Sequence, residues 1–450
     1  MTFFRVAPIL LLLGETAASQ QQADIVSRII KPDRPVIAVP DLRGSGEAQK
    51  VMETFNATLF ADLQDSAAFK MAAKSMYPNE TPQRPQDFRA PAGETRQGPW
   101  LTDWGNPPVE ANYLTIGYTG VTNNQLTLLG WLFDVKQSDL ANASMFGKVY
   151  NGSLDQAGAR KVAHEFAADV LAKFGIKSLH QTRVFFTSDR SGHKEIWSMD
   201  TDGGDQRQLT RLGSISNFVA VSPDNSRIAF TTYAKGNPSI MVLSLETGRL
   251  LPFYNPNASA NGTPEFTLDG KVLFASTTAS HSMQLFVANL DGSALRRLSV
   301  SPAIDVEPKV NPKTGVDLVF ASGRSGSEQI YKMTMDGNDA VRLTSGEGDA
   351  SNPAWHPDGQ HIAFAWTKGY DPGNFNIFIM DVVSGQTVQL THGRGRNENP
   401  TWAPDGRHLV FSSDRSGTNQ IYTMLADGTN VRSLTSRAQG INSNPVWSKQ

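Results

Sequence analysis

The sequence contains no cysteine among its 450 residues. This absence excludes disulfide bonds, thiolate metal sites and a cysteine nucleophile. It also excludes the lipid anchor of bacterial lipoproteins, which is attached to a cysteine at the cleavage site. A form of this chain that folds outside the cytoplasm must therefore be held together by its own hydrophobic core.

The sequence also has little net charge and few extended apolar stretches. Lys and Arg number 41 and Asp and Glu number 43, so the formal net charge is only -2. A chain with this balance has no general electrostatic attraction to nucleic acid or to anionic lipid, and we expect no nucleic-acid partner. No segment beyond the N-terminal region is apolar over the length that a membrane-spanning helix needs.

The N-terminus has the pattern of an export signal. Arg5 is followed by a short apolar run, Val6–Leu13, and then by small residues at Ala17, Ala18 and Ser19. This run is too short for a membrane anchor, and the order is typical of a cleavable signal peptide, here residues 1–20. The alternative, a buried N-terminal helix, fits less well with the polar glutamines that follow at once. The sequence therefore predicts an exported protein.

Recognisable catalytic machinery is absent as well. The sequence has no Gly-x-Ser-x-Gly elbow, no His-x-x-x-His or His-Glu-x-x-His pair and no Gly-rich phosphate loop. Its eight histidines are scattered, and His356 lies in a Pro-Asp-Gly turn, where we expect it at the surface. We therefore predict no enzyme activity, no cofactor and no metal site. Two alternatives stay open: an exported enzyme of the lyase or peptidase-like kind, and a generic exported binding scaffold.

The strongest positive signal is a repeat that begins near residue 183. Its period is about 40–47 residues, as in propeller blades. The fullest copy has Asn-Pro-Thr-Trp at 399–402, Pro-Asp-Gly at 404–406, apolar runs at 409–411 and 421–424, and Leu-Thr at 434–435. Six copies can be traced, and short apolar strands separated by Pro, Asp and Gly turns are typical of stacked sheets. The sequence predicts a six-bladed, all-β propeller over 183–450.

The two ends of the repeat region predict how the ring closes. The first copy lacks the Asn-Pro-x-Trp strand, whereas the chain ends with an extra one at Asn444–Trp447. Because an open stack of sheets leaves exposed edges, we expect this C-terminal strand to complete the first blade. Trp355, Trp402 and Trp447 occupy one position of the repeat, and we interpret them as packing between blades rather than as ligand-stacking residues.

Residues 24–176 lack the repeat and predict a small N-terminal α/β domain. Strands are expected at 36–39, 113–118, 126–135 and 146–150, and helices at 51–63 and 155–174, the second ending at Gly175. The Pro-rich stretch 78–99 is expected to be a long loop without a core pattern, and 176–182 a linker. The fold class is thus two-domain: a small α/β domain followed by a six-bladed β-propeller closed by the C-terminal strand.

The order of these parts resembles the TolB family, the periplasmic component of the Tol–Pal system of Gram-negative bacteria. The resemblance rests on the export signal, on the α/β domain with Gly147–Gly152 ahead of its last helix, and on repeats with Ser-Asp-Arg-Ser-Gly, Ile-Tyr-x-Met and Leu-Thr segments. It implies a soluble periplasmic monomer that supports outer-membrane integrity and cell division and that colicins exploit for import. It also implies that the propeller binds the lipoprotein Pal, that the mature N-terminus binds TolA, and that partners extend to other Tol proteins and outer-membrane lipoproteins.

Two groups of residues are candidates for these contacts. In a propeller, the loops after the second strand of the repeat and the connections between blades lie on one face, where their polar side chains surround the mouth of the channel. The mouth candidates, which we assign to Pal, are Asn217, Glu347, Asp349, Asn352, His392, Arg394, Arg396, Asn397, Glu398, Asn399 and Asn442. For TolA the resemblance implies the residues at the mature N-terminus, Gln20, Gln21, Gln22, Ala23 and Asp24.

Overall fold

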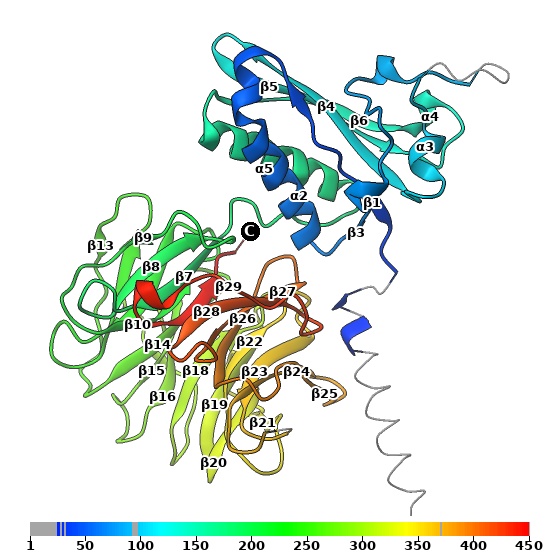
Figure 1. Cartoon of the computed structure of the whole chain (residues 1–450). Helices are drawn as coiled ribbons and strands as arrows, with labels where there is room; N and C mark the ends of the chain where they lie inside the picture. The colour runs from blue at the N-terminus through cyan, green and yellow to red at the C-terminus, as the bar shows by residue number, and fades with distance from the viewer. Residues whose placement is uncertain (1–24, 28, 31–32, 92–97, 370, 450) are drawn as a thin grey trace, which may run out of the picture. The chain divides into compact units, whose positions relative to one another are not determined.

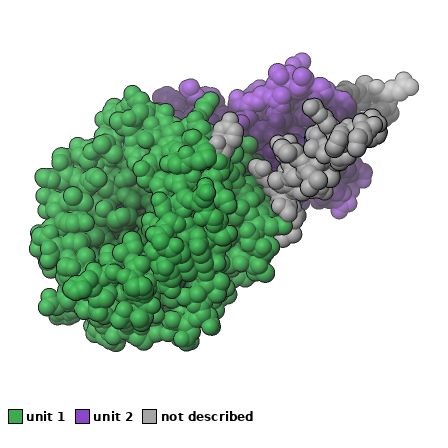
Figure 2. Space-filling view, turned by 90° about the horizontal axis from the view of Figure 1, so that it is seen from below, with its two compact units in different colours: residues 1–30, 181–450 green, residues 31–180 purple. Residues whose placement is uncertain are grey.

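The computed structural model describes residues 25–27, 29–30, 33–91, 98–369 and 371–449. The expected signal peptide, 1–20, and the proposed TolA-binding residues Gln20–Asp24 lie outside the described residues. The chain forms two compact units, Lys31–His180 and Gln181–Gln450, and the described residues before Lys31 group with the second unit (Figure 2). Among the helices that the structure describes, none combines the length and the hydrophobicity that crossing a bilayer requires.

The unit Lys31–His180 is an α/β fold built on one mixed sheet (Figure 1). Its strands are β1 (Val36–Ala38), β2 (Arg43–Gly44), β3 (Lys70–Met71), β4 (Tyr113–Thr122), β5 (Gln125–Asp134) and β6 (Ser144–Ser153), and its helices are η1 (Gly46–Val51), α2 (Met52–Asp65), η2 (Lys74–Met76), η3 (Pro85–Asp87), α3 (Thr102–Gly105), α4 (Leu140–Ala143) and α5 (Gln156–Ala172). The sheet order is β3-β1-β4-β5-β6, with β2 paired to β4. β1 pairs in parallel with β3 and β4, and β4, β5 and β6 are antiparallel.

The helices α2 and α5 pack on one face of this sheet (Figure 1). Phe55 of α2 and Phe166 of α5 are fully buried in the same core as Leu128 of β5. α5 begins after Asp155, whose carboxylate accepts a hydrogen bond from the Gly158 N–H at 2.8 Å and so caps the first turn. The two helices and the four strands expected in this region are confirmed, with strand ends that differ by a few residues.

The Pro-rich stretch contributes to a second core, which the sequence pattern does not reveal. Phe88 has only 5% of its surface exposed and packs edge-on against Trp100 and Phe133. Phe133 alternates along β5 with Leu132 of the first core, so the second core lies on the opposite face of the sheet. The stretch has no core pattern in its sequence, as expected, because aromatic residues scattered among prolines show neither a helical nor a strand period. Phe88 nevertheless makes it part of a core.

The unit Gln181–Gln450 contains six four-stranded antiparallel sheets, the blades of a β-propeller (Figure 1). From the innermost strand outward they are blade 1, β30 (Asn442–Trp447), β7 (Arg183–Ser188), β8 (Glu195–Asp200) and β9 (Arg207–Gln208); blade 2, β10 (Ser216–Val221), β11 (Arg227–Thr232), β12 (Ser239–Ser244) and β13 (Leu250–Leu251); blade 3, β14 (Asn261–Phe266), β15 (Val272–Ser276), β16 (Gln284–Ala288) and β17 (Arg296–Arg297); blade 4, β18 (Asp305–Val310), β19 (Asp317–Ser325), β20 (Ser327–Thr334) and β21 (Val341–Arg342); blade 5, β22 (Ala350–Trp355), β23 (His361–Trp366), β24 (Asn376–Asp381) and β25 (Thr387–Gln389); and blade 6, β26 (Asn397–Trp402), β27 (His408–Ser413), β28 (Gln420–Leu425) and β29 (Arg432–Ser433). The predicted six-bladed architecture is confirmed.

Each blade buries one phenylalanine at the same position of its second strand. These residues are Phe186, Phe230, Phe274, Phe320, Phe364 and Phe411, all with less than 2% of their surface exposed. Burying such a ring contributes about 1.5–3 kcal/mol relative to an exposed one. The recurring apolar run of the repeat thus supplies the core of every blade.

The C-terminal strand closes the ring as the extra repeat segment predicts. In β30, Trp447 pairs with Val184 and Val446 with Phe185 of β7. The Trp447 side chain is buried, and its Nε1–H donates to Thr182 Oγ1 at 2.9 Å. Trp355 and Trp402 are buried at the equivalent positions, so the prediction that these tryptophans serve packing is confirmed.

The Leu-Thr segment that ends the repeat has a hydrogen-bonding role. In five blades the hydroxyl at its second position accepts a backbone N–H from the start of the third strand: Thr210 from Ile196, Ser299 from Leu285, Thr344 from Ile330, Thr391 from Ile377 and Thr435 from Ile421. In blade 2 the Asn255 amide oxygen accepts the corresponding N–H, from Ile240. The short fourth strand is thereby fastened to its blade at the end that faces the channel mouth.

Candidate functional site

The predicted mouth is formed by two kinds of segment that lie on one face of the propeller. Asp189, in the loop between β7 and β8, accepts a hydrogen bond from the Ile441 N–H at 2.7 Å. Asp414, in the equivalent loop of blade 6, accepts one from the Arg396 N–H at 2.7 Å. Each bond joins a loop to the connection that leads into the same blade, so both kinds of segment surround one opening.

The innermost strands line a central channel with a repeated backbone distortion. Each has a β-bulge at a residue whose φ is positive, between 47° and 55°: Phe218, Thr263, Glu307, Asn352, Asn399 and Asn444. All six residues line the channel. Asparagine tolerates this left-handed region better than most residues, which explains why the repeat begins with Asn-Pro in its best-preserved copies.

The side chains of these channel residues form hydrogen bonds from blade to blade. Thr263 Oγ1 accepts the Glu307 N–H at 3.2 Å, and the Glu307 carboxylate accepts the N–H and the Nδ2 group of Asn352 at 2.7 and 2.8 Å. Asn352 Oδ1 in turn accepts the Asn399 N–H at 3.2 Å. Burial raises the pKa of the Glu307 carboxyl, although the Asn352 donors oppose the shift. The chain of bonds holds the channel wall of blades 3 to 6 in one conformation.

A further acidic group, Glu328, lies beside Asp349 at this mouth. Burial, together with the negative charges of Glu307 and Asp349, raises the pKa of Glu328 to about 7. Asp349 Oδ1 also accepts the Glu328 N–H at 3.2 Å. The mouth next to blades 4 and 5 therefore contains a carboxyl group whose charge depends on pH.

Replacing Glu328 with Gln should make the protein more stable at pH 8 by about 1 kcal/mol. The pKa of Glu328 is higher in the folded protein than the ordinary value of 4.5, so its contribution to stability is present below pH 4.5 and is lost as the pH rises through about 7. The gain in stability is smaller than the full change in the pKa of Glu328 implies, because the side chain is partly exposed to solvent. Urea unfolding at pH 5 and pH 8 measures it.

The control for this variant is Glu246→Gln, which changes an exposed glutamate outside the channel. It should leave the difference in stability between the two pH values unchanged. An E328Q protein with the pH dependence of the wild type would show that Glu328 does not titrate in this range.

The structure divides the predicted mouth residues by exposure. Glu347, Asp349, His392, Arg394 and Arg396 are exposed, Asn217, Asn352, Glu398 and Asn399 are half-buried, and Asn397 and Asn442 are fully buried. Among the half-buried residues, Asn352 and Asn399 belong to the channel wall. The exposed and half-buried residues form the mouth surface that a partner can reach.

Asn397 and Asn442 instead hold the mouth loops from inside. Asn397 Oδ1 accepts a hydrogen bond from Arg415 Nη2 at 2.7 Å, and Asn442 Oδ1 accepts one from Arg190 Nη2 at 2.9 Å. In the closed ring neither side chain can touch a partner, and we leave both out of the mouth surface.

The arginines of the Ser-Asp-Arg-Ser-Gly loops form a repeated support beneath this surface. In blade 4, where the loop reads Ser-Gly-Arg-Ser-Gly, the Arg324 guanidinium lies 5.3 and 4.9 Å from the ring centroids of Phe320 and Tyr331 and donates to the buried Asp305. Arg190 and Arg415 have equivalent surroundings in blades 1 and 6. The loop motif thus positions the mouth rather than contributing a free charge to it.

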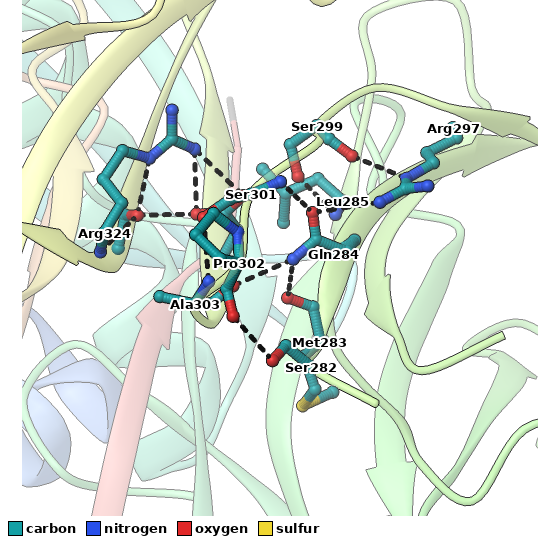
Figure 3. Close-up of polar contacts among 12 residues, drawn as sticks. Ser282, Met283, Gln284, Leu285, Arg297, Ser299, Ser301, Pro302, Ala303 and Arg324 are labelled. Atoms are coloured by element: carbon teal, nitrogen blue, oxygen red, sulfur yellow. Dashed lines mark hydrogen bonds and ion pairs between the residues drawn. The ribbon is translucent and has the colours of Figure 1, made fainter. Parts of the chain in front are cut away.

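Side chains at the start of the third strands link neighbouring blades on the same face. Figure 3 shows the junction of blades 3 and 4, where Gln284 donates to the Ala303 carbonyl at 2.9 Å and accepts the Ser301 N–H at 2.8 Å. Gln420 does the same between blades 6 and 1, where it donates to the Gly440 carbonyl at 2.8 Å and accepts from Asn442 Nδ2 at 2.9 Å. These hydrogen bonds join neighbouring blades at the rim of the mouth at both junctions.

Several residues were not among the predicted candidates: Phe218, Thr263, Glu307 and Asn444 line the channel, and Glu328 lies beside Asp349 at the mouth. Glu307 precedes Pro308 and so occupies the Asn position of the Asn-Pro segment, a signal that could have identified it. Glu328 has no such signal, because its proximity to Glu307 and Asp349 depends on how two blades pack.

The architecture defines a class of protein: a six-bladed β-propeller preceded by a small α/β unit, with a polar mouth that opens on a channel lined by bulged inner strands. The family model described as the TolB beta propeller domain matches residues 173–365 and 343–450. The chain belongs to the TolB family, which confirms the resemblance seen in its sequence.

Individual relatives agree with this assignment. The TolB homolog of Chlorobium luteolum is 35% identical over 307 residues, which are 68% of this chain and 68% of that protein. The Tol-Pal system protein TolB of Bordetella pertussis is 31% identical over 182 residues, 40% of this chain and 41% of that protein. The crystal structure of TolB from Acinetobacter baumannii has a TM-score of 0.73 at 21% identity and covers 93% of this chain and 97% of that chain, a likeness of fold.

Proposed function

We propose that this protein is a periplasmic component of a Tol–Pal system that acts by binding other proteins and not by catalysis. Membership of the TolB family supports the assignment, since one relative carries the name of that system. In this role the protein supports outer-membrane integrity and cell division and offers colicins a route of import.

The observation that carries the proposal is the exposed polar mouth on a fixed backbone. Arg396 lies 4.7 Å from the Phe375 ring centroid and pairs with Glu398 at 2.8 Å, so its guanidinium is held in place. A surface whose charged groups are pre-positioned loses little conformational entropy when a partner binds. Charges of both signs around the opening favour a partner with a complementary pattern.

We assign Pal to the mouth surface and TolA to the N-terminal residues. The Pal contact comprises Glu347, Asp349, His392, Arg394 and Arg396 at the rim and Asn217, Asn352, Glu398 and Asn399 nearer the channel. The TolA contact comprises Gln20–Asp24, for which the family resemblance is the support. Two partners on two separate segments allow one molecule to connect proteins of different membranes.

Replacing both Arg394 and Arg396 with Glu should weaken Pal binding at least tenfold, about 1.4 kcal/mol or more. The change removes two exposed positive charges and places negative ones beside Glu398 and near Asp414. Isothermal titration of purified Pal into the full chain, at one fixed ionic strength, measures the loss.

The matched control reverses two exposed lysines on turns at the opposite end of the strands, Lys271 and Lys313, and should bind Pal like the wild type. A chain without Gln20–Asp24 should still bind Pal but should no longer bind TolA. Unchanged Pal affinity in the Arg394/Arg396 variant would show that Pal binds at a different surface. A wild-type protein that binds neither partner contradicts the Tol–Pal assignment and favours a generic scaffold or, if it turns over oligosaccharide or peptide, an enzyme.

A further inference from the structure

The turn between β22 and β23 differs from the other turns of the propeller in carrying two histidines. It runs from His356 through Asp358 to His361. The surface position expected for His356 is wrong: its exposed fraction is 8%, and that of His361 is 4%. His356 is covered by blade 6, where the Trp402 ring lies edge-on with centroids 4.5 Å apart.

Three side chains converge in this turn. His356 Nδ1 lies 3.0 Å from one carboxylate oxygen of Asp358, and His361 Nδ1 lies 2.7 Å from the other. The possible ligand atoms of the three residues all lie within 4.8 Å of one another. The Asp358 side chain is about one third exposed, so solvent reaches the cluster from one side.

The partners of His356 leave a lone pair directed at a carboxylate. Its Nε2 lies 2.8 Å from the Gly406 carbonyl, which can only accept, so the proton of the neutral ring is on Nε2. Nδ1 then accepts the Asp358 N–H at 3.1 Å and also faces the Asp358 carboxylate. Two acceptors this close call for a cation between them.

The other ring nitrogen of His361, Nε2, faces a carboxylate without reaching hydrogen-bond distance. Among the described residues Nε2 has no hydrogen-bond partner, although it is buried, and its nearest carboxylate is Asp381 at 3.8 Å. Histidines that bind a metal through one nitrogen almost always direct the other toward a carboxylate or a backbone carbonyl. His356 has such a partner in the Gly406 carbonyl, whereas His361 Nε2 faces the Asp381 carboxylate at 3.8 Å, beyond hydrogen-bond distance.

We propose that His356, Asp358 and His361 bind a divalent transition-metal ion of the zinc class through both Nδ1 atoms and one carboxylate oxygen. Two imidazoles and a carboxylate are a donor set that zinc takes readily, and water from the exposed side supplies the fourth ligand. Binding replaces the hydrogen bond from the Asp358 N–H to His356 Nδ1. The ion would fix the turn of blade 5 against Gly406 of blade 6.

Blade 6 provides an internal comparison. Its turn contains the same carboxylate–imidazole pair, Asp405 and His408, at 2.7 Å, but alanine stands at 403, the position equivalent to His356. The pair alone is therefore a structural feature of this kind of turn. The third ligand, His356, is what makes blade 5 a metal site.

The test is zinc binding by the full chain, prepared without a histidine tag and treated with chelator. Titration of Zn²⁺ should show one site of micromolar or tighter affinity, and the melting temperature should rise with Zn²⁺ concentration. His356→Ser, which introduces the residue found at the equivalent position 222 of blade 2, should weaken that affinity by more than about tenfold. Co²⁺ in the same site should give visible absorption that the variant lacks.

His408→Ala is the matched control and should bind Zn²⁺ like the wild type, which separates this site from adventitious binding at other histidines. Equal zinc affinity in the wild type and in H356S overturns the proposal. So does a wild type whose melting temperature responds to pH but not to Zn²⁺, since a proton would then be the cation between His356 and Asp358.

Discussion

A chain that lacks Pro445–Gln450 should lose the closed propeller and its cooperative unfolding. The deletion removes the part of β30 that pairs with Val184 and Phe185, together with the buried Trp447. Truncation of one buried tryptophan costs about 3–5 kcal/mol, a large share of a typical domain stability of about 5–15 kcal/mol. The edge of β7 is then unpaired and favours aggregation. Thermal melts followed by circular dichroism, with gel filtration, measure the effect.

The tail also connects blade 1 to both of its neighbours. Thr401 of blade 6 donates from its hydroxyl to the Pro445 carbonyl at 2.9 Å. On the other side, the Lys449 N–H donates to Asn225 Oδ1 of blade 2, and Asn225 Nδ2 donates back to the Lys449 carbonyl, both at 2.9 Å. The deletion therefore removes contacts among three blades at once, which is why its effect should exceed that of any single substitution in the strand.

Trp355→Ala is the matched control, because Trp355 occupies the same repeat position in a blade whose four strands are continuous in sequence. W447A and W355A should destabilise to a similar extent, about 3–5 kcal/mol, and the deletion should exceed both. A truncated chain that melts within about 2 °C of the intact protein would show that the ring does not depend on this closure.

Ring closure could be predicted from the sequence because it depends on counting repeat segments. One Asn-Pro-x-Trp segment is missing at the start and one is left over at Asn444–Trp447, and pairing with β7 follows from the need to cover an edge. The mouth face could be predicted for the same reason, since the order of strands in a blade decides which loops share an end. Periodicity likewise identified α2 and α5.

Contacts that depend on packing between blades could not be predicted in this way. His356 looks like a turn residue until Trp402 and Gly406 of the next blade cover it. Asn397 looks like an exposed polar residue until its Nδ2 group is seen to donate to Asn376 Oδ1 of blade 5 at 3.2 Å. In both cases the distance along the chain gives no hint of the contact, because the repeat hides which copy faces which.

Replacing Arg324 with Met should destabilise the propeller by about 3–5 kcal/mol. Both carboxylate oxygens of Asp305 accept hydrogen bonds from Arg324 Nη2 at 2.9 Å, and the Asp305 side chain is fully buried. Methionine keeps much of the packing against Phe320 and Tyr331 but removes the only positive charge that the structure places within ion-pair distance of this carboxylate among the described residues. A buried charge that loses its partner is strongly destabilising.

Arg415 separates the effect of charge from that of packing. It stacks on Phe411 and Tyr422 in the same way, but its buried partner is the neutral Asn397. R415M should therefore lower the free energy of unfolding by only about 1–2 kcal/mol, because it leaves one neutral polar group without a hydrogen-bond partner. The double variant D305N/R324M, which lacks the buried charge, should recover most of the stability lost in R324M.

Urea unfolding of the three variants decides between these causes. Equal losses of stability in R324M and R415M would mean that stacking on the aromatic rings, and not the charge of Asp305, accounts for the geometry that these loops share. If instead R324M is the weaker protein and D305N restores it, blade 4 is held by an ion pair where blades 1 and 6 use neutral amides. The mouth surface would then depend most on pairing at Asp305, two residues before Glu307 of the channel wall.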